Sequence, residues 1–158
     1  LWIDATILVT NKIPKNVFEL PFYSIKGEEW GFFITKCRWA NYFLSTRKEN
    51  PLFAGVLELF YAYLSKEDSF IDYFLMDYFI DILYNENGMI QKSIDQVKPN
   101  NPDISFLRWN LNNTFEPWHY AKICERTFAH KLTWKGRMAP FDSTGNKTYY
   151  SHILNINK

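Results

Sequence analysis

The chain has 158 residues, of which 47% are hydrophobic and 19% aromatic, and its formal net charge at neutral pH is +1. This length corresponds to one domain or part of one, and the hydrophobic content excludes a disordered chain. The near balance of charges argues against a general nucleic-acid binder, which needs a basic surface to displace counterions from the polyanion.

The two cysteines, Cys37 and Cys124, are far apart and lack the spacing of a zinc site or a disulfide framework. Reduced thiols in a cytoplasmic protein are the simpler interpretation. No apolar run reaches the ~18 residues that span a bilayer, and no signal peptide is visible. Because the chain begins without Met and opens inside a strand-like run, we expect it to be the C-terminal part of a longer protein.

The first ten residues, LWIDATILVT, are apolar and β-branched except for a single carboxylate at Asp4. This pattern predicts a strand that is buried on both faces. Residues two apart on a strand share a face, so Asp4 and Thr6 would direct their oxygens to the same place. Two interpretations of Asp4 are open. It caps a turn or pairs with a lysine at the strand end, or it reaches a ligand site where open α/β sheets bind ligands.

Alternating patterns predict further short strands at residues 22–26, 31–35 and 38–45, arranged as a hairpin or meander beside the first strand. A single helical turn is expected after residues 11–15. Asn50 and Pro51 mark the start of a helix, because Asn is a favoured cap and Pro a favoured first residue.

Apolar residues at helical spacing predict that this helix extends to Leu64 and that a second one runs from Asp68 or Ser69 to Leu83. Residues 89–101 are only weakly patterned. The remaining elements are expected to be short helices or a strand, at residues 103–111, 116–126, 127–134 (the strand) and 144–156. The mixture predicts an α/β fold with helices packed on a small mixed sheet.

Two isolated polar residues are candidates for a site. Asn41 lies between Trp39 and Phe43 in a strand-like segment, where it is either a bulge or edge amide or a ligand-binding group. Asp72 follows Asp68 by four residues in the second predicted helix, where it is either a solvated carboxylate or a hydroxyl-binding group.

A third candidate is the block His130-Lys131-Leu132-Thr133-Trp134-Lys135. Strand alternation places His130 and Lys131 on opposite faces. Nearby lysines disfavour the charged form of a histidine, and a neutral imidazole is able to ligate a metal or donate to a phosphate. The alternative is a solvated basic strand end.

Taken in order, six blocks of the chain form a recognisable pattern. They are residues 2–6 (WIDAT), 21–26 (PFYSIK), 39–44 (WANYFL), 50–53 (NPLF), 71–75 (IDYFL) and 130–135 (HKLTWK). This ordered set resembles the bacterial capsular polysaccharide synthesis protein family, sugar transferases of the GT-A type related to the yeast initiating mannosyltransferase. The two glycines that the GT-A pattern has before the first block are absent.

The resemblance implies a GT-A-like α/β fold in which residues 1–158 are one fragment, with the N-terminal nucleotide-binding half missing. It implies a bacterial glycosyltransferase that moves a sugar from a nucleotide-sugar donor to a growing capsular or surface polysaccharide or to a lipid-linked glycan. Such a protein is expected in the cytoplasm, with peripheral association at the inner face of the plasma membrane.

The resemblance also implies roles for individual residues. Asp4 and Asp72 are expected to be catalytic, and Asp4 and His130 to hold a divalent cation, Mn or Mg. Donor and diphosphate binding is expected of Thr6, Asn41, His130, Lys131 and Lys135. Thr6 stands where the GT-A pattern has a second Asp, and a hydroxyl is a poor substitute for a carboxylate ligand. The lysines would then neutralise the diphosphate directly, as point charges.

A second class of function is a non-catalytic glycan-binding module that stacks sugars on its aromatic rings. A glycoside hydrolase is a third, but it needs two facing carboxylates, and the sequence identifies no partner for Asp4.

Overall fold

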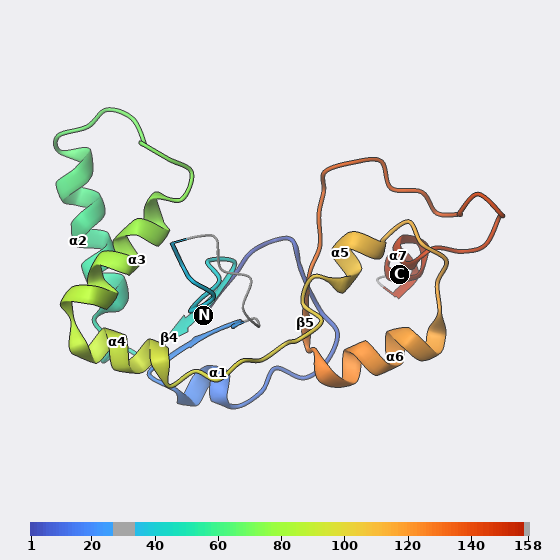
Figure 1. Cartoon of the computed structure of the whole chain (residues 1–158), viewed down its shortest axis with the longest axis horizontal. Coiled ribbons are helices and arrows are strands. Elements are labelled where there is room, and N and C mark those ends of the chain that lie inside the picture. Colours follow the sequence, from blue (N-terminus) through green and yellow to red (C-terminus); the bar gives the residue numbers. More distant parts are fainter. Residues whose placement is uncertain (27–33, 157–158) are drawn as a thin grey trace. The chain divides into compact units, whose positions relative to one another are not determined.

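The computed structural model describes residues 1–26 and 34–156. These residues form two compact units. Unit 1 contains Leu1–Ile3 and Pro14–Asn100, and unit 2 contains Asp4–Ile13 and Asn101–Lys158. Each unit has its own small antiparallel sheet and its own helices, drawn in sequence colours in Figure 1.

The sheet of unit 1 has the order β1 (Trp2–Ile3), β4 (Phe43–Thr46), β3 (Phe22–Ser24). The pairing is antiparallel, with Ile3 opposite Phe43 and Ser24 opposite Leu44. The Ser24 hydroxyl also accepts the Ala40 N–H at 2.7 Å, which fixes the chain that enters β4. The short helix α1 (Asn16–Glu19) precedes β3.

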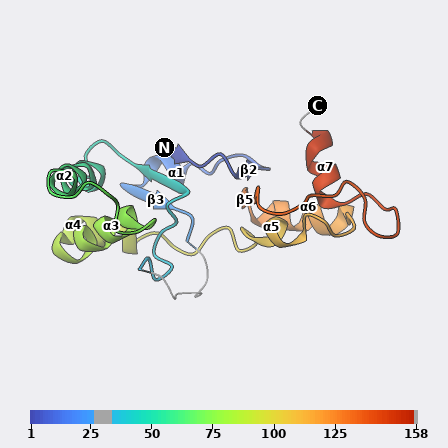
Figure 2. The same cartoon turned by 90° about the horizontal axis from the view of Figure 1, so that it is seen from above.

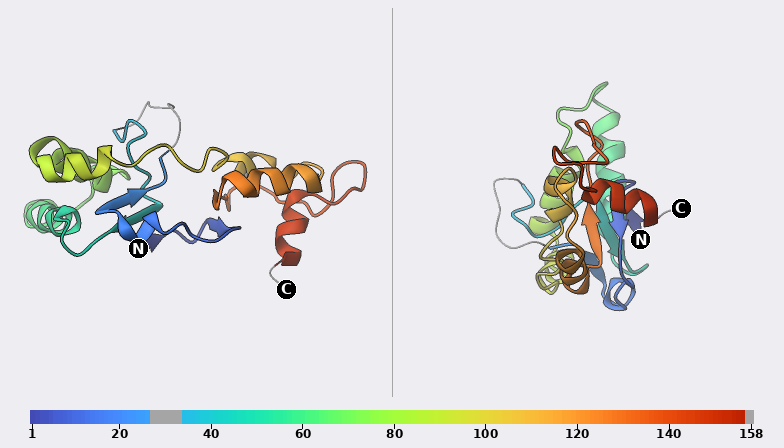
Figure 3. Two further views of the ribbon diagram at one scale, coloured as in Figure 1. Left: turned by 90° about the horizontal axis from the view of Figure 1, so that it is seen from below. Right: turned by 90° about the vertical axis from the view of Figure 1, so that its right-hand side faces the viewer.

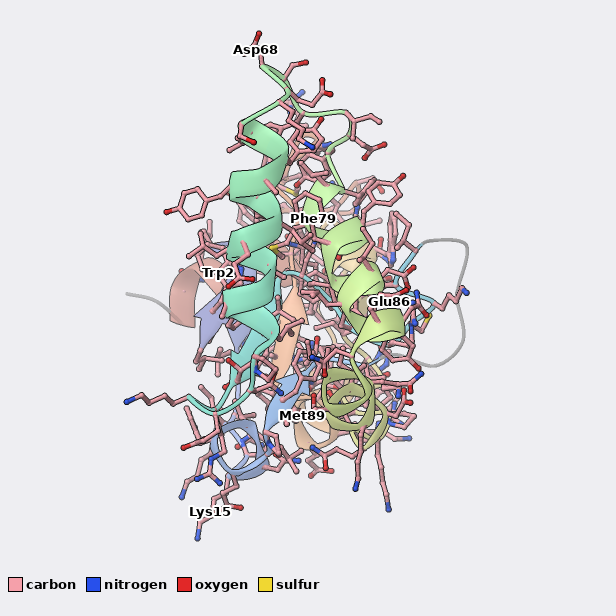
Figure 4. The ribbon with its side chains drawn as sticks, turned by 90° about the vertical axis from the view of Figure 1, so that its left-hand side faces the viewer. Trp2, Lys15, Asp68, Phe79, Glu86 and Met89 are labelled. Atoms are coloured by element: carbon pink, nitrogen blue, oxygen red, sulfur yellow. The ribbon has the colours of Figure 1, made fainter. Side chains whose placement is uncertain are left out.

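The helices of unit 1 are α2 (Leu52–Leu64), α3 (Leu75–Glu86) and α4 (Gly88–Asp95). The Asn50 side chain accepts the Leu52 N–H at 2.9 Å and so caps α2. Figure 4 shows α2 and α3 side by side, with Phe79 between them and Asp68 in the loop that joins them. In the interior of the unit, Phe22 and Leu44 of the sheet pack in one buried apolar cluster with helical residues that include Ile80.

Unit 2 pairs β2 (Ile7–Val9) with β5 (Ala129–Lys131) in an antiparallel ladder, seen from above in Figure 2. Its helices are α5 (Phe106–Asn110), α6 (Pro117–Arg126) and α7 (Tyr149–Ile156), which Figure 3 shows from two further directions. Their buried faces form a separate apolar cluster of five residues: Leu107, Leu111, Ile123, Tyr149 and Ile153.

Backbone and ionic contacts fix β5 within unit 2. The Asn101 side chain accepts the Phe128 N–H at 2.9 Å, and the Lys131 N–H donates to the Ile104 carbonyl at 2.8 Å. Arg126, at the end of α6, binds the Asp103 carboxylate through two nitrogens, the shortest contact being 2.6 Å. The position of β5 therefore depends on several independent contacts with the segment that precedes α5.

The prediction of one buried strand over the first ten residues is wrong. A turn at residues 4–6 divides the run into β1 and β2, which pair with different partners. Leu1 and Trp2 are more than half exposed. An apolar run predicts strand conformation but does not show where the run turns, because here the turn is formed by one side chain, that of Asp4.

The other strand predictions differ in their bounds. The strand predicted at 38–45 begins only at Phe43, since residues 38–42 form turns and irregular backbone. Most of the strand predicted at residues 31–35 lies outside the described residues, and Ile34 and Thr35 belong to a turn.

Among the helices, the starts of α2 and α6 are confirmed, whereas α3 begins six residues after Ser69, at Leu75. The weakly patterned residues 89–101 include all of α4 except its first residue, Gly88, and the sequence did not predict this helix. Asn87 follows α3, and its side chain caps α4 by accepting the N–H groups of Met89 and Ile90. The final helix, α7, is shorter than the predicted 144–156.

The predicted α/β class is confirmed by these helices and small antiparallel sheets. The predicted mixed sheet is not seen, since every strand pair within the described ranges is antiparallel. That residues 1–158 are one fragment of a larger domain stays a prediction. Among the described helices, none has the length and apolar character needed to cross a bilayer.

Candidate functional site

Asp4 opens the turn between β1 and β2. Its carbonyl accepts the Ile7 N–H at 3.0 Å, and its carboxylate oxygen Oδ1 accepts the Thr6 N–H at 2.8 Å and the Thr6 hydroxyl. An Asp side chain that bonds the backbone two residues later is a common way to stabilise a turn. The local sequence Asp-Ala-Thr therefore forms its own loop, with the carboxylate at its centre.

Lys131 reaches this turn from β5. The strand register places Lys131 opposite Ile7, and the Leu132 N–H donates to the Thr6 carbonyl at 2.8 Å. The Lys131 ammonium lies 3.0 Å from Asp4 Oδ1 and donates to the Thr6 hydroxyl. The side chains of Lys131 and Asp4 are 20% and 38% exposed, so a ligand in solution is able to reach both.

Asp4 remains ionised at any ordinary pH. Hydrogen bonds from the Thr6 hydroxyl and the Thr6 N–H, with a smaller contribution from Lys131, lower the pKa of Asp4 to about 2, against the opposing effect of burial. Hydrogen bonds to the charged form of an acid favour that form. The site thus combines a carboxylate anion, an ammonium and a hydroxyl within direct contact of one another.

These contacts are the ones expected of the first interpretation of Asp4, a turn cap that pairs with a lysine. The expectation that Asp4 and Thr6 share a strand face is wrong, because both lie in the turn. Their oxygens nevertheless meet at the same ammonium. The catalytic role of Asp4 and the donor-binding roles of Thr6 and Lys131 stay predictions.

His130 faces the other side of β5, as the alternation predicted. Its side chain is fully buried, with Nε2 3.0 Å from the Thr10 hydroxyl and 4.0 Å from the Cys124 sulfur. Burial lowers the pKa of His130, so the imidazole is neutral at pH 7. The structure brings Lys131, rather than His130, into contact with Asp4, and the predicted metal and diphosphate roles of His130 stay predictions.

The side chains around Asp4 do not fit a protein-held divalent cation. The described residues contain no group of three His, Cys, Asp or Glu side chains able to hold a metal ion. In addition, the carboxylate that would ligate the cation already contacts an ammonium. At an effective dielectric constant of about 20, unit charges 4 Å apart interact by about 4 kcal/mol, so a dication beside Lys131 would meet roughly twice that repulsion.

Lys135 lies beyond the end of β5, in an exposed segment. Its Nζ is 5.8 Å from the ring centre of Trp134, and its N–H donates to the Thr133 hydroxyl at 3.1 Å. The predicted role of Lys135 in diphosphate binding stays a prediction.

Asn41 belongs to unit 1, where it contacts a residue that the sequence analysis missed. Its amide nitrogen donates to Asp77 Oδ2 at 3.0 Å, while the Trp39 ring N–H donates to Asp77 Oδ1 at 2.9 Å. Asp77 lies on α3 and is only 2% exposed. Burial raises the pKa of Asp77, although these two hydrogen bonds act in the opposite direction. In the sequence, the one feature that points to Asp77 as a buried acid is its place between the apolar residues Met76 and Tyr78 of a predicted helix.

A second ionic contact supports the same part of unit 1. Arg38 pairs with Asp81, one helical turn after Asp77, and its guanidinium lies 4.7 Å from the Trp39 ring centre and 4.1 Å from that of Tyr84. Residues 38–41 are therefore attached to α3 by both ionic and hydrogen-bonded contacts. Asn41 is neither the bulge nor the edge amide that its sequence context also allowed.

Asp72 also belongs to unit 1 and precedes α3 instead of lying within it. Its Oδ1 accepts the Phe74 N–H at 2.7 Å, which closes a turn before the helix begins. The expectation that Asp72 lies on an exposed helix face is wrong. Its side chain accepts the backbone N–H of Phe74 and so favours a turn over a helix at this point. Its predicted catalytic role stays a prediction.

Comparison with known proteins supplies the family. The family model described as "Capsular polysaccharide synthesis protein" matches residues 1–153. The chain belongs to this family. The match includes the Asp4 turn, Asp77 and Lys131, and it confirms the resemblance inferred from the ordered blocks. No curated protein and no solved structure was found to match the chain.

Proposed function

We propose that this member of the capsular polysaccharide synthesis protein family is a glycosyltransferase. It moves a sugar from a nucleotide-sugar donor to a growing capsular or surface polysaccharide, or to a lipid-linked glycan. Family membership supports the biosynthetic role. The observation that carries the proposal is the solvent-accessible Asp4 carboxylate, held ionised beside the ammonium of Lys131.

The chemistry of these groups suits a nucleotide-sugar donor. An ionised carboxylate only accepts hydrogen bonds, and the hydroxyls of a ribose or a sugar donate them. An ammonium binds phosphate oxygens as a point charge. Asp4 and Lys131 together therefore complement a ligand that carries hydroxyls next to a diphosphate. The GT-A likeness of the fold is part of this proposal.

The proposal also uses two polar residues of unit 1, Asp72 and Asn41. Asp72 is half-buried, and its Oδ1 accepts the Phe74 N–H, so its second carboxylate oxygen would accept from a sugar hydroxyl. We assign it to hydroxyl binding on the acceptor or the donor sugar. Asn41 has its amide nitrogen directed to Asp77, which leaves the amide oxygen as the group that would accept from a sugar hydroxyl.

The test measures transfer and hydrolysis by the full-length protein with a panel of nucleotide sugars. We expect Asp4→Ala to abolish both, because the donor loses its hydroxyl acceptor and Lys131 loses its carboxylate partner. The matched control is Asp142→Ala, which removes the other Asp-x-Thr turn of unit 2, where Asp142 accepts the N–H and the hydroxyl of Thr144 at 2.8 Å. Full activity of Asp4→Ala would refute the catalytic role of Asp4.

A glycan-binding module is the second candidate, favoured by three tryptophans of unit 2. Trp109, Trp118 and Trp134 are each about 70% exposed or more. Exposed indole rings are apolar faces with a polar edge, which suits stacking on sugars. If the full-length protein bound capsular oligosaccharides but no nucleoside diphosphate, and replacing the three tryptophans abolished that binding, the module would be the correct function.

A further inference from the structure

Lys131 is not required for the turn that it contacts. The second Asp-x-Thr turn of unit 2, at residues 142–144, closes with the same bonds from the Thr144 N–H and hydroxyl to one Asp oxygen. In the part of the chain that the structure describes, the other hydrogen-bond donors to the Asp142 carboxylate are Thr114 and Asn146, and no lysine is among them. An Asp-x-Thr turn therefore forms without an ammonium. Stabilisation of the turn does not explain why Lys131 lies beside Asp4.

The position of Lys131 is fixed by the backbone. Its own N–H binds the Ile104 carbonyl at 2.8 Å, and the next N–H binds the Thr6 carbonyl at 2.8 Å. These bonds and the β2–β5 register hold the Lys131 backbone beside the turn. An ammonium held in place before a ligand arrives loses less conformational entropy on binding than one on a mobile side chain.

The Asp4 turn carries a positive charge of its own. Asp4 supplies one carboxylate, Thr6 supplies a hydroxyl, and Lys131 supplies the positive charge next to both. A diphosphate that enters the site meets this positive charge directly, whereas a dication would have to share the Asp4 carboxylate with it.

We propose that Lys131 binds the diphosphate of the nucleotide donor in place of a divalent cation, so that nucleotide binding by this protein is independent of metal. The inference rests on the proposed function. Asp4 then has two roles. It keeps the ammonium oriented toward the ligand, and it accepts hydrogen bonds from the hydroxyls of the donor. Thr6 orients both charged groups through its hydroxyl, which explains how a threonine serves where the GT-A pattern has a second Asp.

The experiment measures the affinity of the full-length protein for UDP, GDP, ADP and CDP by calorimetry, once in excess EDTA and once in Mn²⁺. We expect one nucleotide to bind in EDTA, with a dissociation constant that Mn²⁺ changes by less than about threefold. Lys131→Met should weaken binding in EDTA by about ten- to a hundredfold, the range for loss of a hydrogen bond between charged groups. Lys131→Arg should retain most of the affinity, because it keeps the charge.

The matched control is Lys122→Met, which removes an exposed lysine of α6 and should leave the affinity unchanged. If nucleotide binding by the wild-type protein requires Mn²⁺, the inference is wrong, whether or not Lys131→Met folds, while the proposed function stands. Unchanged affinity of a folded Lys131→Met protein would overturn it too. If none of the nucleotides binds under either condition, the proposed function itself fails.

Discussion

Asp4 illustrates how a single side chain sets both local structure and charge. Its Oδ1 accepts from the Thr6 N–H, the Thr6 hydroxyl and the Lys131 ammonium, and these bonds lower its pKa to about 2. Because this pKa lies below that of an unfolded Asp, about 3.9, the ionised group stabilises the fold above pH 4. That contribution is lost as the pH falls through the folded pKa.

The pKa of Asp4 should respond more to Thr6 than to Lys131. The Thr6 hydroxyl bond is the largest cause of the shift, and the hydrogen bond and the charge of Lys131 are each smaller causes. We therefore expect Thr6→Val to raise the pKa of Asp4 further than Lys131→Met does, both toward the usual range. NMR titration of the Asp4 carboxyl carbon measures this. A larger rise in Lys131→Met would show that the ion pair dominates.

The residues of the site were only partly predictable. The sequence identified Asp4, Thr6 and Lys131 as candidates, since each is polar within a strand-like pattern. It also proposed His130 beside Asp4, but alternation along β5 directs His130 to the Thr10 side. Which of two neighbours faces the turn depends on strand register, and the register depends on contacts far apart in sequence.

At the scale of the elements, α3 shows why a helix was predictable and its key residue was not. Its apolar spacing predicted the helix, and Phe79 and Ile80 are buried as such a pattern requires. Asp77 is buried on the same helix because Trp39 and Asn41 donate to it from a distant segment. A buried acid with partners 36 and 38 residues away leaves no periodic signal.

Loss of the Asp77 carboxylate should destabilise unit 1. Asp77→Ala leaves the Trp39 N–H and the Asn41 amide without their acceptor, and each unpaired buried group costs about 1–3 kcal/mol. We expect a loss of about 2–5 kcal/mol in the free energy of unfolding, measured by urea denaturation, and a smaller loss for Asp77→Asn, which keeps one oxygen acceptor.

The matched control for Asp77 is Asp95, an exposed carboxylate at the end of α4 that accepts from the Tyr84 hydroxyl at 2.9 Å. Surface substitutions of this kind usually change stability by less than about 0.5 kcal/mol. Equal losses for Asp77→Ala and Asp95→Ala would contradict a structural role specific to the buried carboxylate.

At the scale of the whole molecule, the sequence predicted the class of fold but not the division of the chain into two units. The alternation of strand and helix patterns predicted α/β, and the ordered blocks predicted the family. The first strand-like run was expected to be a single element, yet β1 pairs with β4 in unit 1 and β2 with β5 in unit 2. Strand pairing is a long-range property, so a continuous apolar run gives no indication that two sheets share it.

Because each unit has its own apolar cluster, we expect a cavity in one core to destabilise that unit first. Leu107 of unit 2 and Leu52 of unit 1 are both fully buried, so the same Leu→Ala change is made in two comparable sites. Each should cost about 2–5 kcal/mol of stability. In hydrogen exchange, Leu107→Ala should lower protection mainly in α5, α6 and β5, and Leu52→Ala mainly in α2, α3 and α4. If either variant lowered protection to the same extent in both sets of elements, the chain would unfold as one cooperative core. The Lys131 site would then depend on packing in unit 1 as much as on its own strands.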